Sequence, residues 1–165
     1  MRRVFSICED IEGDSYKELL KCLLVKCPTF HLVWIDSVTY EASAISIRME
    51  LGRWEIDRRR RSAWPGIRYS SSKPIATVIF YKTDPQQIEM LERPKSLFGW
   101  MAPKWPEDVG FYAEDRSCAF ATVSHERGGW LFDVSVAAML PASIGLAEET
   151  WIDKDFEIFD SPVEL

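Results

Sequence analysis

The chain has 165 residues, of which 47% are hydrophobic and 28% charged. This length and composition fit one globular domain and leave too little chain for two ordinary ones. The charge is uneven, because residues 1–105 carry 17 Lys and Arg against 13 Asp and Glu, whereas residues 106–165 carry 3 against 13, which gives the formal net charge of −6. We therefore expect a single domain over residues 1–165 with an acidic C-terminal third, and an acidic segment at 148–165.

The sequence also suggests a location. Three acidic residues interrupt the N-terminus before a long apolar run accumulates, and no stretch approaches the about 18 apolar residues of a membrane span. We expect a cytoplasmic protein with no leader peptide and no membrane contact. The cysteines form no C-x-x-C pair and only two histidines accompany them, so we expect reduced thiols and no structural zinc.

The first predicted element is a helix. The S-x-x-E pattern of Ser15 and Glu18 is typical of a capping box, and an apolar stripe with helical spacing then runs from Tyr16 to Cys27. Pro28 ends the helix, because the residue before a proline is disfavoured in the α region. Residues 29–35 are predicted to form a buried strand in which His31 is a hydrogen-bonded core histidine.

Residues 37–56 fit two patterns. Ile45, Ile47 and Met49 alternate as in a strand, while Tyr40, Ala44, Ile47 and Leu51 share one helical face. We favour a helix that stops at Gly52, followed by a strand. The alternative is one long strand with a bulge at Gly52 and Arg53.

The middle of the chain is predicted to contain a turn at residues 64–66 and a buried, central strand at 75–81. Asp84 and Pro85 are typical of a helix start, so a short helix is expected at 86–92. Residues 94–106 are expected to form an ordered loop rich in aromatic side chains.

The last third is predicted to be an antiparallel meander with strands at 109–112, 117–123 and 130–136. The final strand would place Trp130, Phe132, Val134 and Val136 on one face. An apolar and acidic segment at 153–160 would add an edge strand. The fold class is therefore predicted to be α+β, with a mainly antiparallel sheet, a C-terminal meander and two or three helices.

Three short motifs support a resemblance. Trp64-Pro65-Gly66, then Trp105-Pro106-Glu107-Asp108 followed by Phe111-Tyr112, and finally Ser124-His125-Glu126 together resemble a pattern found in small uncharacterised bacterial proteins. The resemblance implies a bacterial cytoplasmic α+β protein with a helix at 40–51. It implies no activity and assigns no site.

The leading functional hypothesis is a non-enzymatic protein-binding module, for example a toxin-neutralising immunity protein. Its acidic C-terminal third would steer a basic partner, and aromatic side chains among the acids would supply apolar contacts. The expected partner-binding residues are Trp151, Asp153, Asp155, Phe156, Glu157 and Phe159. An edge strand whose charges only discourage aggregation is the alternative interpretation of this segment.

A small hydrolase or transferase is the second hypothesis. It would use His125 with Glu126 and a pocket near Trp100–Trp105. The sequence contains no nucleophile motif and no phosphate-binding loop, so no catalytic residue is assigned and no cofactor is expected. Neighbouring carboxylates at 107–108 and 114–115 are typical of solvated turns, and no metal is expected there.

Nucleic-acid binding through Arg58–Arg61 is the third hypothesis. Arginine matches phosphate oxygens well. However, consecutive residues of a strand face opposite sides, and the net charge repels nucleic acid. We therefore expect the run to be a solvated or edge-protecting strand, or an internal partner for the acidic end, and we do not expect it to bind nucleic acid.

Overall fold

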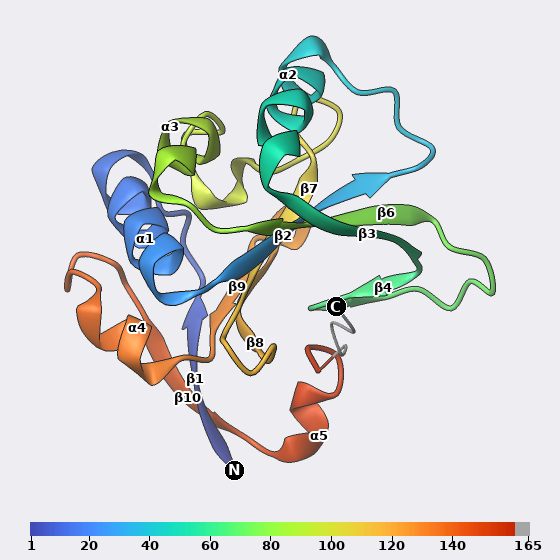
Figure 1. Ribbon diagram of the computed structural model, residues 1–165. Helices are drawn as coiled ribbons and strands as arrows, with labels where there is room; N and C mark the ends of the chain where they lie inside the picture. The colour runs from blue at the N-terminus through green and yellow to red at the C-terminus, as the bar shows by residue number, and fades with distance from the viewer. Residues whose placement is uncertain (161–165) are drawn as a thin grey trace.

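One large antiparallel sheet organises the computed structural model, which describes residues 1–160 (Figure 1). Its order is β10-β1-β9-β8-β7-β2-β6-β3. The strands of this sheet are β1 (Arg2–Ile7), β2 (Thr29–Ile35), β3 (Glu55–Arg61), β6 (Ala76–Lys82), β7 (Glu107–Tyr112), β8 (Cys118–Val123), β9 (Gly128–Leu131) and β10 (Ala147–Trp151). A separate hairpin consists of β4 (Ala63–Trp64) and β5 (Ile67–Arg68).

Five helices accompany the sheet in the described part of the chain, and three of them have six residues or fewer. They are α1 (Gly13–Lys26), α2 (Ala42–Leu51), α3 (Ile88–Leu91), α4 (Val134–Met139) and α5 (Asp153–Phe156). This is the α+β class with a mainly antiparallel sheet that the sequence predicts. None of the described helices is long and apolar enough to cross a membrane.

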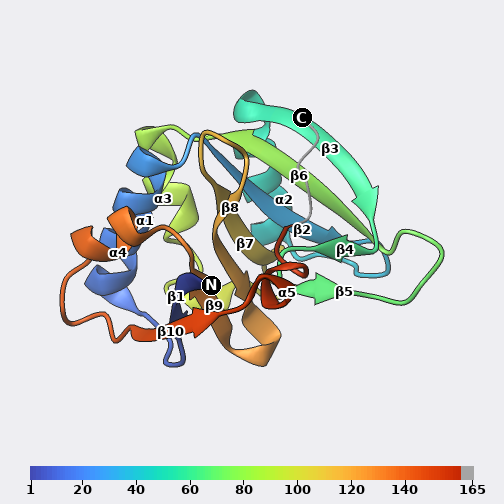
Figure 2. The same ribbon diagram turned by 90° about the horizontal axis from the view of Figure 1, so that it is seen from below.

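Both faces of the sheet are covered, which explains its continuous apolar strands. Helices α1 to α4 pack on one face, where they enclose the main core, while the β4–β5 hairpin and α5 lie on the other (Figures 1 and 2). In β2, Leu32 and Trp34 belong to the main core, whereas Val33 packs with Trp64 of the hairpin on the opposite side.

Helix α1 confirms the predicted apolar stripe, since Tyr16, Leu19, Leu20 and Leu23 are buried. It ends at Lys26, because Cys27 before Pro28 is extended. The capping-box prediction is wrong. The helix begins at Gly13, two residues before Ser15. The positive φ of 56° at Gly13 directs the backbone into the first helical turn at that point. Ser15 is thus already helical, and no side chain caps this end.

Residues 42–51 form the favoured helix rather than the alternative long strand. Gly52 does not adopt a left-handed conformation. Its φ of −54° and ψ of −30° continue the right-handed course into a short 3₁₀ turn, after which β3 begins at Glu55.

Strand β6 confirms the predicted buried strand, but it is not central, because only β3 separates it from the edge of the sheet. The Asp84 carboxylate caps the following turn by accepting a hydrogen bond of 2.8 Å from the backbone N–H of Gln86, as its position before Pro85 predicts. The loop at 94–106 is ordered by a 3₁₀ turn at Leu97–Gly99 and by the buried rings of Trp100 and Trp105.

The meander is confirmed up to Leu131, where β9 ends, but β9 already begins at Gly128, because the turn lies at Ser124–Glu126 and not at the two glycines. The prediction of a strand to residue 136 is wrong, since Val134 and Val136 lie in α4. Asp133 causes the change, because its carboxylate accepts hydrogen bonds from the backbone N–H groups of Ser135 and Val136 and thereby caps a helix.

The final edge strand is also placed differently. Strand β10 at 147–151 forms that edge by pairing with β1, while residues 153–156 form the single turn of α5. Residues 161–165 of the predicted acidic segment lie outside the described residues.

Candidate functional site

A β-bulge at Asp108 is the first element of the candidate site. Leu32 of β2 pairs with Val109 and Val33 pairs with Glu107, so Asp108 is the extra residue of β7. Its φ is +44°, a left-handed conformation that Asp adopts more readily than most residues. The Thr122 side chain fixes the adjacent backbone, because its hydroxyl oxygen lies 3.0 Å from the Val109 nitrogen and 3.1 Å from the Val109 oxygen.

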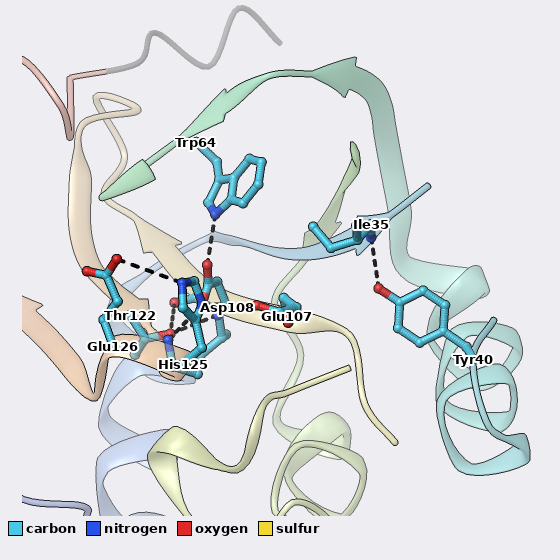
Figure 3. Close-up of polar contacts among 10 residues, drawn as sticks. Ile35, Tyr40, Trp64, Glu107, Asp108, Thr122, His125 and Glu126 are labelled. Carbon is cyan, nitrogen blue, oxygen red and sulfur yellow. Dashed lines mark hydrogen bonds and ion pairs between the residues drawn. The ribbon is translucent and has the colours of Figure 1, made fainter. Parts of the chain in front are cut away.

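The Asp108 carboxylate is fully buried. It accepts a hydrogen bond of 2.9 Å from the Trp64 indole and one of 2.8 Å from the backbone N–H of Ser124 (Figure 3). Burial raises the pKa of Asp108 to about 6, against the opposing effect of these two bonds. One carboxylate therefore connects the β4–β5 hairpin, the start of β7 and the end of β8.

The turn between β4 and β5 positions the Trp64 indole. Pro65 and Gly66 occupy the two central positions, and Gly66 has a φ of +89°, as a type II turn requires. A Cβ atom on Gly66 would lie 2.7 Å from the Val123 side chain. Glycine is therefore needed here both for the backbone conformation and for the close contact with β8.

His125 completes the arrangement from the 3₁₀ turn at Ser124–Glu126 that follows β8. Its Nδ1 lies 3.3 Å from Glu107 Oε2, and its Nε2 lies 3.8 Å from Glu126 Oε1 (Figure 3). One ligand atom each from Glu107, Asp108 and His125 lies within 4.8 Å of the others. We call Glu107, Asp108, His125 and Glu126 the β7–β8 site.

The side chains of the β7–β8 site range from buried to exposed. The Asp108 side chain is enclosed, the Glu107 side chain is 17% exposed and that of His125 is 43% exposed. The Tyr69 ring packs against the Trp64 ring at a tilt of 43°, with 5.7 Å between ring centroids. Burial and the nearby carboxylates of the β7–β8 site raise the Tyr69 pKa. The arrangement can bind a cation or exchange a proton with a ligand at the surface.

Sequence reasoning named these residues but grouped them differently. It associated His125 with Glu126, whereas the structure also brings His125 to Glu107. It associated the carboxylates at 107–108 with those at 114–115, but Glu114 and Asp115 lie in the turn at the other end of the β7–β8 hairpin. The three short motifs of the sequence do meet here, through Trp64, Asp108 and Ser124.

The pocket expected near Trp100–Trp105 is filled by these two rings. Both are buried, with centroids 6.4 Å apart, and the Trp100 indole donates a hydrogen bond of 2.8 Å to the Tyr16 hydroxyl. They stabilise the core instead of lining a binding site.

Of the predicted aromatic anchors of the acidic segment, Phe156 and Phe159 face inward, whereas Trp151 is half-buried. Phe156 and Phe159 are buried in a cluster with Trp130, Phe132 and Trp151, whose ring centroids lie 4.9 to 6.5 Å apart. In this conformation the two phenylalanine rings cannot contact a partner, because the chain itself covers them.

The acidic side chains of this segment do reach the surface. Asp153, Asp155 and Glu157 are exposed. Arg2 lies 3.8 Å from Asp153 and 3.9 Å from Asp160. The role of this segment in binding a partner stays a prediction.

The arginine run lies on β3, the other edge of the sheet, and its burial alternates along the strand. Arg58, Arg59 and Arg60 form ion pairs of 2.6 to 2.7 Å with Glu55, Asp57 and Asp36, respectively. The run is thus split between two sides and largely neutralised by carboxylates of the same chain.

His31 is buried and hydrogen-bonded, as predicted for a core histidine. All four cysteines are free thiols.

Comparisons with protein-family models, curated proteins and solved structures found no significant match.

Proposed function

We propose that this protein is a non-enzymatic protein-binding module that docks a basic partner through its acidic C-terminal third, for example as a toxin-neutralising immunity protein. One observation carries the proposal. Between residues 106 and 160, three cations are exposed, Arg116, Arg127 and Lys154. The exposed carboxylates of the same range are three times as many: Glu114, Asp115, Glu126, Glu148, Glu149, Asp153, Asp155, Glu157 and Asp160. Such a surface attracts a basic partner and accelerates its association.

Two aliphatic side chains replace the buried phenylalanines as candidate anchors. Ile152 is 54% exposed and Ile158 is 37% exposed, and both lie among the carboxylates of the segment. Apolar groups surrounded by charge supply the contacts that slow dissociation, whereas the charges set the association rate. Phe156 and Phe159 hold the segment against the sheet in this arrangement.

A reducing bacterial cytoplasm is part of the proposal. The free thiols support it, because disulfides are rare in that compartment. Purification of the tagged protein from its native host, followed by identification of a basic protein in comparable amount, supplies the partner for the kinetic test.

The kinetic test separates charge from anchor. Replacing Asp153, Asp155 and Glu157 by Asn and Gln is expected to slow association at low salt and to flatten its salt dependence, with little change in dissociation. Ile152→Ala and Ile158→Ala are expected to speed dissociation instead. Surface plasmon resonance with the purified partner measures both rates.

Matched controls lie away from the segment. The controls for the charge variant are three exposed carboxylates replaced by Gln, those of Glu9, Glu41 and Glu89. The control for the isoleucine variants is the exposed Val25 replaced by Ala. If the triple variant associates at the wild-type rate in low salt, the acidic segment is only a solvated edge of the sheet, and the proposal is contradicted.

The second candidate, a small hydrolase or transferase, is favoured by the 3.3 Å contact of His125 with Glu107. A carboxylate beside an imidazole can orient it for proton transfer. The two candidates differ in the expected effect on partner binding. The binding module is favoured if the variant with Asp153, Asp155 and Glu157 replaced loses the partner while His125→Gln binds it with wild-type affinity.

A further inference from the structure

We propose that the β7–β8 site binds one divalent metal ion of the Zn²⁺ class through Glu107, Asp108 and His125. This inference goes beyond the docking of a partner, and it departs from the sequence-based expectation of no metal. The departure arises because the β7–β8 hairpin brings a histidine to two carboxylates that follow each other in the chain.

The ligand types select the metal. Two carboxylates and one imidazole suit Zn²⁺, while Mg²⁺ and Ca²⁺ prefer sites made of oxygen ligands alone. Ligand atoms about 2.0 to 2.1 Å from a tetrahedral Zn²⁺ lie about 3.3 Å from each other. The observed 3.3 Å between His125 Nδ1 and Glu107 Oε2 fits this spacing. The third ligand lies within 4.8 Å, so only a small side-chain shift is needed.

Other groups already contact the proposed ligands in the way that second-layer groups do around a bound metal ion. The Asp108 carboxylate is oriented by the Trp64 indole and by the backbone N–H of Ser124. On the far side of the imidazole, Glu126 lies 3.8 Å from Nε2. Metal-binding carboxylates and histidines are held by such partners, and a carboxylate beyond the histidine is a frequent one.

The negative charge of the site also favours binding of a cation. The Asp108 carboxylate is enclosed beside that of Glu107, and no Lys or Arg within residues 1–160 forms an ion pair with either. Buried charges are usually paired or coordinate a metal. The exposed edge of His125 gives an entry path, and three protein ligands leave a position for water or for a side chain of a partner.

The test uses the full chain after removal of metals with a chelator. Titration calorimetry with Zn²⁺ is expected to show one ion per chain, with weaker binding of Mn²⁺ and no comparable binding of Mg²⁺. His125→Gln and Glu107→Gln are expected to lower the Zn²⁺ affinity by at least tenfold. Glu126→Gln is expected to lower it by about tenfold, because it removes an outer-shell partner.

A matched control is Glu114→Gln, an exposed carboxylate at the opposite end of the same hairpin, which is expected to bind Zn²⁺ as the wild type does. His125 is exposed, so its variant is expected to fold, and circular dichroism checks this. Wild-type protein that binds no Zn²⁺, or binds it no better than His125→Gln, would overturn the proposal. The result is independent of any partner, so it can fail while the docking proposal stands.

Discussion

His31 is enclosed by three neighbours in the interior of the sheet. Its Nδ1 shares a hydrogen bond of 2.7 Å with the Tyr112 hydroxyl, and its ring meets Phe80 edge-on at 6.0 Å between centroids. The third neighbour is Gly110 on β7, where a Cβ atom would overlap the imidazole. Burial, together with the charge of Arg61, lowers the His31 pKa to about 3.

This low pKa predicts an acid-dependent loss of stability. The unfolded chain binds a proton at His31 below about pH 6.5, whereas the folded chain does so only near pH 3, so the unfolded state holds more protons in between. The free energy of unfolding should therefore fall as the pH is lowered through this window. The contribution of His31 approaches about 1.4 kcal/mol per pH unit. Urea unfolding between pH 7.5 and pH 4 measures it.

His31→Gln is the control, because the amide can still form a hydrogen bond with Tyr112 but does not titrate. The variant is expected to be less stable than wild type near pH 7, and the difference should shrink as the pH falls. Parallel stability curves for the two proteins would contradict the assignment.

The helix caps in the structure differ from the one that the sequence pattern predicts. Asp133→Ala is expected to lower the free energy of unfolding by about 1 kcal/mol, because it removes the cap of α4. Ser15→Ala is expected to change it by less than about 0.5 kcal/mol, since Ser15 caps nothing. Urea unfolding at pH 7 compares the two. Asp133→Asn should retain most of the stability, and an equal loss for Ser15→Ala would contradict the observed cap.

Local patterns predicted most elements, because helical stripes and short aromatic strands depend on neighbours in the chain. Residues 13–36 and 76–91 are examples, with ends set by Pro28 and Asp84. The pattern was insufficient where two signals competed. Val134 and Val136 continue the alternation of a strand, but the Asp133 cap and packing of Val136 in the main core favour a helix.

The candidate site could have been found only from strand register. Gly110 pairs with Ala121 and Phe111 with Phe120, so the start of β7 lies opposite the end of β8 and Glu107 approaches His125. The predicted strands and turn contain this information. The bulge at Asp108 does not follow from any local pattern, because it depends on pairing with β2, about 75 residues earlier in the chain.

The arginine strand β3 and the acidic strand β10 lie at opposite edges of the sheet. Because Arg58, Arg59 and Arg60 form ion pairs within the chain, we expect no nucleic-acid binding at β3. Gel shifts with duplex and single-stranded DNA and RNA at low salt measure this. Tight, salt-sensitive binding that is lost on Arg59→Glu and Arg61→Glu would contradict it.

The position of β1 has a consequence for how the chain is made. Phe5 pairs with Leu131 of β9 on one side and with Glu148 of β10 on the other, so β1 is enclosed by two strands that come much later in the chain. Its partners do not exist until more than 120 further residues have been synthesised. Contacts of such long sequence separation slow folding, and an unpaired apolar strand invites aggregation. We expect the nascent protein to depend on a chaperone that shields β1 until β9 and β10 have been synthesised.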